Sequence, residues 1–475
     1  MNNIRLKNFR NIDDTGIIRL RPLTILVGKN GMGKSSLMRF FPLLKQSVAV
    51  SKRGPLLWYS DKGVDFGDFR SVVKNGRNNI EIGFSINYGM GTNSPFAIDL
   101  NLTIVPEKQD SKPDEISYDF VECLNMNFTG NKISIQFDKK SDDNDSSSVA
   151  RVLINGNYYG EVNYEYFMSG IFPVIINGNE DNSIPGFKEL KNLLTGNRKF
   201  KFTEPSDFIG ISFEDFKNMI IGNEYGYSIK TVYERILFAS LRSLLINLTM
   251  LIRFDAESVT YIGPFRDVPQ RYYRFQNLST NQIDMRGSNM AVFANAMPKE
   301  KLCQFNTKAK EHFGFELESE NHSGHICINI IQKGKSTNIV DNGFGYSQVM
   351  PVLLALHSFT YAGVHAPFSF GEDGQLMCIE QPELHLHPAM QYQLGQTFVD
   401  SVKYFKKKQE SKKIMVETHS RSFIDEIGEA VADKQIEADD VAVYIFDGDA
   451  DRVLIRLSEF DEEGFLKDWP LGFLD

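Results

Sequence analysis

Cysteine is scarce in this sequence. The chain of 475 residues holds only four, none in C-x-x-C spacing: Cys123, Cys303, Cys327 and Cys378. Four scattered cysteines do not indicate a disulfide framework or a cysteine-rich zinc site. They are better explained as buried, reduced thiols. The first residues also lack the basic and apolar segments of a secretion signal. We therefore expect a cytoplasmic protein in a reducing compartment.

Long apolar runs and heptad repeats are also missing. The longest apolar candidate, residues 238–251, is interrupted by Ser240, Arg242 and Asn247, whereas a membrane span needs roughly 18 continuous apolar residues. It reads as a buried helix, so no membrane association is expected. No heptad pattern persists over three or four repeats, which excludes a long coiled-coil arm.

An excess of basic residues is a third absence. The net charge is −9, whereas a protein that clamps nucleic acid usually presents a basic face. Two short basic clusters occur, at 403–413 and around Phe200, the latter with Arg198, Lys199 and Lys201. A solvated helix end explains the first cluster more simply than a DNA-binding patch. DNA binding is thus left open but is not indicated by charge.

A complete phosphate-binding pattern stands near the N-terminus. Residues 28–35 read Gly-Lys-Asn-Gly-Met-Gly-Lys-Ser, which fills every fixed position of G-x-x-x-x-G-K-[ST] after an apolar run at 23–27. The alternative, a strand–turn–helix junction with no ligand, would not require the lysine and the hydroxyl. Backbone N–H groups would surround the phosphates of ATP, Lys34 would neutralise their charge and Ser35 would hold Mg²⁺. The predicted nucleotide contacts in this loop are Asn30, Gly31, Gly33, Lys34, Ser35 and Ser36.

The rest of the predicted nucleotide site lies far along the chain. Residues 376–380 form an apolar run that ends in Glu380, as expected for a buried parallel strand that presents a carboxylate to Mg²⁺. Residues 341–348 form a glycine-rich turn before an apolar helix, and residues 413–420 form a strand that ends in a polar cluster with His419. A single site on one chain does not need two phosphate-facing glycine loops.

These motifs, in this order, resemble the ABC-type ATPases of the RecF, SMC and OLD group. Residues 4–11 resemble the first strand and turn of that group, 28–35 its Walker A, 343–348 its signature loop, 376–380 its Walker B, 383–388 its D-loop and 417–420 its switch-histidine motif. The resemblance covers both ends of the chain and is weak between about 80 and 255. It implies an α/β head with a mixed sheet, ATP and Mg²⁺ as cofactors, and Ser35 and Glu380 as the metal-binding residues.

The resemblance also implies partners. In this group ATP lies between Walker A of one head and the signature loop of another, so the chain should be at least a dimer, with Gly345 and Ser347 contacting the neighbour's nucleotide. The most similar subgroup comprises short ATPases of bacterial anti-phage systems such as PARIS and Septu, which share a tail like residues 469–473 here. It implies a separately encoded effector, such as a nuclease, and a phage-encoded trigger. A RecF-like DNA-repair ATPase is the main alternative.

Two departures from the group's pattern affect the mechanism. The position after Glu380 is normally a second acid, but here it is Gln381, which orients water without accepting its proton. Slow hydrolysis is therefore expected, and Glu383 or His419 would serve as the proton acceptor instead. In the signature loop, Tyr-Ser-Gln at 346–348 replaces the usual Ser-Gly-Gly.

Three further patterns have two interpretations each. His385 and His387 have a spacing that suits zinc, but the D-loop resemblance favours an interface role. Residues 260–273 carry arginines among aromatics, which suits either a phosphate or base contact or a buried turn. The aspartates near the C-terminus suit an autonomous nuclease centre or, more simply, an Asp-Gly hairpin between 441–446 and 452–457: Asp447, Asp449 and Asp451.

The predicted organisation has three parts. Residues 1–105 form the first part of the head, with antiparallel strands at 79–105. Residues 106–254 form an inserted lobe, mostly helical or irregular, with polar loops at 108–115 and 138–148, an irregular stretch at 178–205 and helices at 213–251. Residues 255–475 complete the head.

Overall fold

The computed structural model places the chain in two compact units. Unit 1 contains Met1–Ile18 and Leu43–Glu257, and unit 2 contains Arg19–Pro42, Ser258–Pro367 and Gly374–Asp475. The residues that the structure describes are 1–89, 95–106, 118–138, 148–166, 170–176, 205–220, 228–275, 280, 282–361, 375–449 and 452–467. The predictions for residues 108–115, 178–204 and 469–473, for most of 138–148 and for Asp451 lie outside these ranges. The predicted three-part boundaries at 105/106 and 254/255 stay predictions.

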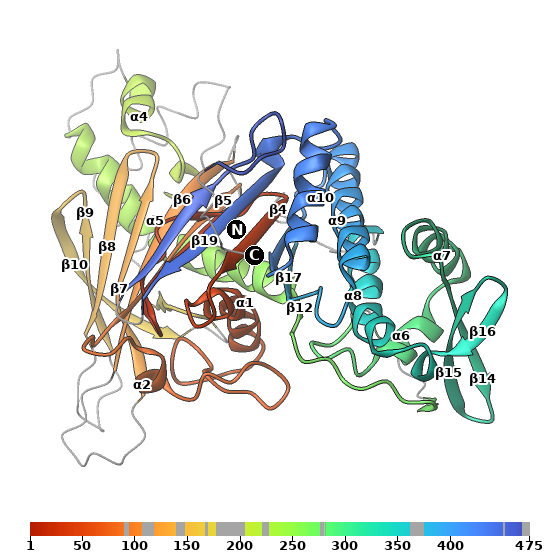
Figure 1. The fold of residues 1–475 in the computed structure, drawn as a ribbon. Coiled ribbons are helices and arrows are strands. Elements are labelled where there is room, and N and C mark those ends of the chain that lie inside the picture. The colour runs from red at the N-terminus through yellow and green to blue at the C-terminus, as the bar shows by residue number, and fades with distance from the viewer. Residues whose placement is uncertain are drawn as a thin grey trace. The chain divides into compact units, whose positions relative to one another are not determined.

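Unit 1 is built on a long antiparallel sheet (Figure 1). Its strand order is β11-β10-β9-β8-β7-β6-β5-β1-β2, and β3 pairs with β1. The strands alternate buried and accessible positions, as expected when one face packs on a core. Their bounds are β1 (Asn3–Phe9), β2 (Ile12–Asp14), β3 (Ile18–Arg19), β5 (Ile80–Tyr88), β6 (Phe96–Pro106), β7 (Asp119–Phe128), β8 (Asn131–Asp138), β9 (Val149–Ile154), β10 (Asn157–Tyr166) and β11 (Pro173–Ile175).

The long helix α5 (Ile229–Glu257) contacts β9 and β11 of this sheet. The amide of Asn131 on β8 donates a 2.7 Å hydrogen bond to the hydroxyl of Tyr233 on α5. The shorter elements of unit 1 are α2 (Phe69–Val72), η2 (Pro205–Phe208) and α4 (Phe213–Ile220). By length and composition α5 is the only helix of the described ranges that could cross a membrane, a property that it shares with buried core helices, and 56% of its most apolar window is buried.

The predicted strands at 79–105 are confirmed, because β5 and β6 pair antiparallel from Ile80↔Ile104 to Tyr88↔Phe96. The predicted helices at 213–251 are confirmed for residues 213–220 by α4 and for residues 229–251 by α5. The expectation of a mostly helical or irregular segment is wrong for residues 119–138 and 149–166, which form β7 to β10 and extend the same sheet. Apolar residues at alternate positions, such as Ile133, Ile135 and Phe137, are buried there.

Unit 2 contains a mostly parallel sheet of order β12-β17-β18-β4-β19-β20, in which only the β19–β20 pair is antiparallel. Helices α8, α9 and α10 lie side by side next to it (Figure 1). Its elements are β4 (Leu23–Gly28), α1 (Lys34–Val48), whose last turns belong to unit 1, β12 (Thr260–Ile262), α8 (Phe344–Tyr361), β17 (Leu376–Glu380), α9 (Pro388–Lys408), β18 (Lys413–Glu417), α10 (Arg421–Ala432), η4 (Ala438–Asp440), β19 (Val441–Gly448) and β20 (Val453–Ser458).

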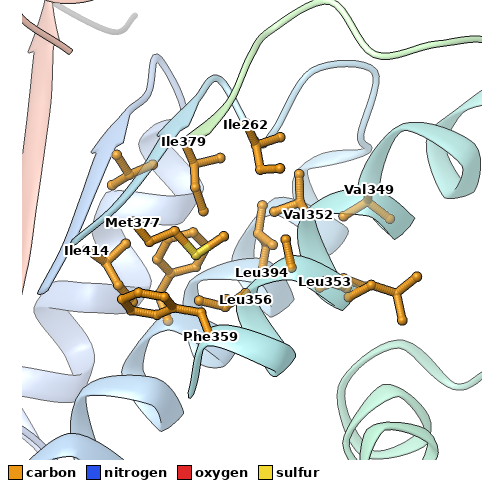
Figure 2. Packing of buried hydrophobic residues seen from close by; sticks show 14 of the residues in the cluster. Ile262, Val349, Val352, Leu353, Leu356, Phe359, Met377, Ile379, Leu394 and Ile414 are labelled. Atoms are coloured by element: carbon orange, nitrogen blue, oxygen red, sulfur yellow. The ribbon is translucent and has the colours of Figure 1, made fainter. Parts of the chain in front are cut away.

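The core of unit 2 explains this arrangement. Strands β4 and β17 are buried at every position, which is typical of parallel strands covered on both faces. Figure 2 shows Met377, Ile379 and Ile414 of the sheet packed against α8 residues such as Val352 and Leu356. Parallel pairing places the carboxyl ends of β12, β17, β18 and β4 at one edge of the sheet. Ligands bind at this edge in open α/β sheets.

A smaller antiparallel sheet completes unit 2. Its order is β13-β15-β14, with β16 paired to β15, and α6 contacts β14 and β15. Its elements are β13 (Tyr273–Arg274), α6 (Met290–Ala296), α7 (Lys299–Phe313), β14 (Glu316–His322), β15 (His325–Gln332), β16 (Lys335–Asn338) and η3 (Ile339–Asp341).

Candidate functional site

The loop between β4 and α1 requires glycine at defined positions. Gly28, Gly31 and Gly33 have φ values of +144°, +79° and +90°, a region that other residues rarely adopt. A Cβ at Gly28 would lie 2.2 Å from the carbonyl oxygen of Phe446 on the neighbouring strand β19. The loop therefore turns tightly out of a buried strand, and α1 begins directly afterwards at Lys34. This is the geometry in which backbone N–H groups and a helix N-terminus receive an anion.

Lys34 is held inside this loop. Its side chain is 3% exposed, and its Nζ donates hydrogen bonds to the carbonyl oxygens of Gly28 at 2.7 Å and Lys29 at 2.9 Å. Burial lowers the pKa of Lys34, while the nearby Glu417 opposes this shift. The lysine is thus a cation fixed beside the loop amides, where a phosphate would find both charge and donors.

Ser35 contacts a carboxylate that the sequence analysis did not single out. Its Oγ donates a 2.7 Å hydrogen bond to Oε2 of Glu417, the last residue of β18. Glu417 is buried, and its Oε1 lies 3.9 Å from Nζ of Lys34. Burial, reinforced by the neighbouring charge of Glu380, raises the pKa of Glu417 to about 7. The available signal was an acid at the end of a second buried strand.

Glu380 lies opposite Glu417 in the register of β17 and β18, and its carboxylate is heavily hydrogen-bonded. Nε and Nη2 of Arg39 donate to its two oxygens at 2.8 Å each, and the hydroxyl of Tyr261 donates at 2.7 Å. Glu380 is 2% exposed, and this pairing raises the pKa of Arg39. Sequence reasoning missed Arg39 and Tyr261, because only the three-dimensional fold brings them to Glu380.

The residues present fit a magnesium ion. Mg²⁺ prefers oxygen ligands and usually takes one or two carboxylates together with phosphates and waters. Ser35, Glu417 and Glu380 offer a hydroxyl and two buried carboxylates at one edge of the sheet. Ser35 contacts Glu417 in the structure, whereas the sequence analysis paired Ser35 with Glu380 as the metal-binding residues. Among the described residues, no group of three or more histidine, cysteine or acidic side chains is arranged so that it could hold a metal ion by itself.

The residues expected near the attacking water also lie at this edge. Gln381 has a φ of +44°, and its N–H donates to the carbonyl oxygen of Glu417 at 2.8 Å. Oε1 of Glu383 accepts a 2.6 Å hydrogen bond from the backbone N–H of His419. Oε2 of Glu383 and Nε2 of His419 are both buried without a partner. Burial raises the pKa of Glu383 and lowers that of His419.

The predicted signature loop forms the first turn of α8. Gly343 has a φ of +82°, and α8 begins at Phe344. Ser347 is 3% exposed and its hydroxyl donates to the carbonyl oxygen of Phe344 at 2.7 Å. A Cβ at Gly345 would lie 3.2 Å from the carbonyl oxygen of His385, so the loop packs closely on the predicted D-loop. The roles of Gly345 and Ser347 toward a neighbouring chain stay predictions.

The two histidines of the predicted D-loop point to separate partners. The ring of His385 meets Phe344 edge-on, with centroids 4.8 Å apart. Nδ1 of His387 accepts from the N–H of Ala389 at 3.3 Å and caps α9. Each ring therefore has a structural contact of its own, and the interface role of these histidines stays a prediction.

The C-terminal aspartates form part of a hairpin. Strands β19 and β20 pair antiparallel through Gly448↔Val453, which confirms the predicted hairpin. Oδ1 of Asp447 accepts from Nζ of Lys29 at 2.9 Å, and Oδ1 of Asp449 accepts from the N–H of Arg452 at 2.9 Å. Hydrogen bonds within the fold account for both described aspartates, and these contacts favour the hairpin interpretation over a nuclease centre.

Solved structures similar to the chain are SMC head domains. The SMC head domain from Thermotoga maritima is 10% identical, with 96% of this chain and 97% of that chain covered and a TM-score of 0.35. An SmcHead bound to the C-winged helix domain of ScpA is 12% identical, with 97% and 98% covered and a TM-score of 0.35. The Smc head domain with an extended coiled coil, bound to the C-terminal domain of ScpA derived from Pyrococcus furiosus, is 11% identical, with 96% and 95% covered and a TM-score of 0.34.

No curated protein is significantly similar in sequence. A family model described as AAA ATPase domain matches residues 1–424. This range contains the glycine loop, Lys34, Ser35, Glu380 and Glu417, whose geometry is that of a P-loop site. The match confirms the expectation of a P-loop ATPase fold. The chain belongs to the AAA ATPase domain family.

Proposed function

We propose that the chain binds ATP with Mg²⁺ at the loop of residues 28–35, hydrolyses it slowly and assembles through shared nucleotide sites. In this proposal the assembly is a sensor and scaffold that controls an effector protein, such as a nuclease, in bacterial anti-phage defence. The observation that carries the nucleotide part is the placement of Lys34 and Ser35 beside two buried carboxylates, Glu380 and Glu417. The defence role is supported by the sequence resemblance alone.

Each residue would have a distinct task at this site. The loop amides and Lys34 would bind the phosphates, and the ion would neutralise charge on them as phosphoryl transfer proceeds. Ser35 and Glu417, with Glu380 alongside, would hold that ion. Arg39 and Tyr261 would fix the orientation of Glu380, because they donate three hydrogen bonds to its carboxylate.

Slow hydrolysis follows from the groups available to a water molecule. Gln381 stands where an acid would accept the proton, and its amide only orients the water. Glu383 has a free, buried oxygen, and its pKa is raised by burial. A carboxylate with a raised pKa is a better proton acceptor when it is ionised. We propose that Glu383, with His419 beside it, supplies the residual general-base function.

Assembly would use the first turn of α8. Gly343, just before α8, adopts a left-handed conformation, and Phe344 is 48% exposed. This turn would offer backbone groups and an apolar side chain to a neighbouring chain. ATP bound by one chain would gain contacts only in the joined state. Differential contact of this kind is what allows a ligand to shift an equilibrium between two states.

The test is the mass of the native particle. The purified chain should grow to at least a dimer with MgATP, and Lys34→Ala should remain unchanged. Copurification from the native host, followed by mass measurement, should reveal a stably bound effector protein. A monomer under all nucleotide conditions would contradict the assembly model. Strong ATP-dependent binding to duplex DNA would instead support the RecF-like alternative.

A further inference from the structure

The segment after β12 exposes its apolar residues and buries an arginine. Phe265 and Val268 are 82% and 70% exposed, whereas Arg266, between them, is 6% exposed. This distribution is the reverse of the usual one, since arginine is almost never fully buried unless it is paired. Such an inversion of a local rule is expected at functional positions.

Arg266 is anchored by one nitrogen only. Its Nη2 donates to the backbone carbonyl oxygens of Glu380 at 2.8 Å and Gln381 at 3.2 Å. Its Nε and Nη1 are buried and have no hydrogen-bond partner. Burial lowers the pKa of Arg266 to about 10, with the charges of Glu383 and Glu380 acting against that shift. The guanidinium therefore stays positive at neutral pH with two of its three nitrogens unused.

The free nitrogens belong to a group of unsatisfied atoms at one edge of the sheet. Arg266 follows β12, Glu383 follows β17 and His419 follows β18, and these strands are neighbours in the order β12-β17-β18-β4. Oε2 of Glu383 and Nε2 of His419 also lack partners. Buried polar atoms without partners are rare in folded proteins and point to an absent water or ligand. Strand β4, which carries the phosphate-binding loop, is the next strand.

We propose that Arg266 recognises the terminal phosphate of ATP and makes the site discriminate ATP from ADP. This inference rests on the proposed binding of ATP at residues 28–35. The backbone contacts of Nη2 orient the guanidinium plane. The N–H groups of Nε and Nη1 diverge from one another, so one of them would donate a single charge-assisted hydrogen bond to an oxygen of the terminal phosphate. The same contacts hold the carbonyl of Gln381, so Arg266 also positions that residue.

The experiment measures the affinities for MgATP and MgADP by calorimetry. Arg266→Gln removes the charge but retains groups that reach the two carbonyls, and it should weaken ATP binding by about tenfold to a hundredfold, the range expected for charge-assisted hydrogen bonds. ADP affinity should stay within about twofold of wild type. Arg266→Lys keeps the charge but not the planar group that Nη2 fixes on the two carbonyls, so we expect a smaller loss for ATP, about threefold to tenfold. The control is Arg274→Gln, the same change at an exposed position of β13.

Unchanged ADP binding also shows that each variant is folded. Equal losses for ATP and ADP, or no loss for ATP, would overturn the proposal and identify Arg266 as a structural residue that contacts buried water. If either Arg266→Gln or Arg266→Lys does not fold, the ratio of the MgATP and MgADP affinities of the other variant tests the role of Arg266. If wild-type protein binds neither nucleotide, the proposed function itself is wrong, which is a different outcome from failure of Arg266 alone.

Discussion

The hydroxyl of Ser35 donates a 2.7 Å hydrogen bond to Glu417, one strand away from the acid that the sequence motif selects. Glu380 is instead clamped by Arg39 and Tyr261. A carboxylate that already accepts three hydrogen bonds has less capacity for a metal ion than one that faces the P-loop serine. In the proposed function, Glu417 would therefore be the more direct magnesium contact, and Glu380 would be its neighbour with a fixed orientation.

We predict that Glu417→Gln weakens the binding of Mg²⁺ at the ATP site. The neutral amide is a poorer magnesium ligand, so the Mg²⁺ concentration needed for half-maximal effect should rise by about tenfold or more. Titration of Mg²⁺ at fixed ATP measures this, and electron paramagnetic resonance of Mn²⁺ gives a second readout. Glu429→Gln, at an exposed position, is the control. If the half-maximal Mg²⁺ concentration is unchanged in Glu417→Gln but rises strongly in Glu380→Gln, then Glu380 is the main magnesium ligand and the prediction is wrong.

We predict that Gln381→Glu raises steady-state ATP hydrolysis, because it restores a proton acceptor next to the expected position of water. General-base help is worth about 10²–10⁴-fold, although a side chain new to this pocket recovers only part of that. Glu383→Gln should lower the residual rate, and Glu380→Gln should weaken Mg²⁺-dependent activity. The rates are compared at saturating ATP. If wild type already turns over rapidly and Gln381→Glu brings no gain, then the long-lived ATP state does not exist.

We predict that Ser347→Arg blocks ATP-dependent assembly while the isolated chain still binds nucleotide. The loop of residues 343–348 is needed only by the neighbouring chain, whereas residues 28–35 bind phosphate within their own chain. Ser347 is 3% exposed, so the larger residue also strains α8. Phe344→Arg, at a position that is 48% exposed, tests the same turn without that strain. Light scattering with MgATP gives the mass, and an increase equal to wild type in Phe344→Arg would exclude this turn from the interface.

A buried histidine predicts a pH effect on stability. His357 on α8 is 7% exposed, and burial lowers its pKa to about 4 from an ordinary 6.5. Between these values the unfolded chain binds the proton and the folded chain does not, so stability is lost as the pH falls from about 6.5 to 4. His357→Leu should remove this component, about 3 kcal/mol at pH 4. Urea unfolding of both proteins at several pH values measures this component. If the free energy of unfolding depends on pH equally in wild type and in His357→Leu, then His357 is not the source of the effect.

The sequence motif sufficed to predict the P-loop, because its residues are contiguous and its glycines have one structural explanation. Gly28 must be glycine to avoid Phe446, and Lys34 follows at a fixed distance along the chain. The partners of the two carboxylates were not predictable in this way. Arg39 and Glu380 are 341 residues apart, and only the strand order β12-β17-β18-β4 brings such residues together.

The strands β7 to β10 were missed for a related reason. Each has polar residues on its accessible face, as in the run Asn131–Asp138, so none is a continuous apolar segment that stands out alone. Pairing with the already predicted β5 and β6 extends the sheet and makes these strands stable. Sheet propagation is a property of the folded unit rather than of any single segment.

The central claim is that residues 28–35 bind the phosphates of ATP, and Lys34→Ala tests it most directly. Lys34 is the buried cation of this loop, fixed by hydrogen bonds to Gly28 and Lys29. Calorimetric titration of MgATP into wild type and Lys34→Ala should show a loss of affinity of about a hundredfold or more in the variant, with the fold intact by circular dichroism. An affinity within about threefold of wild type would contradict the account.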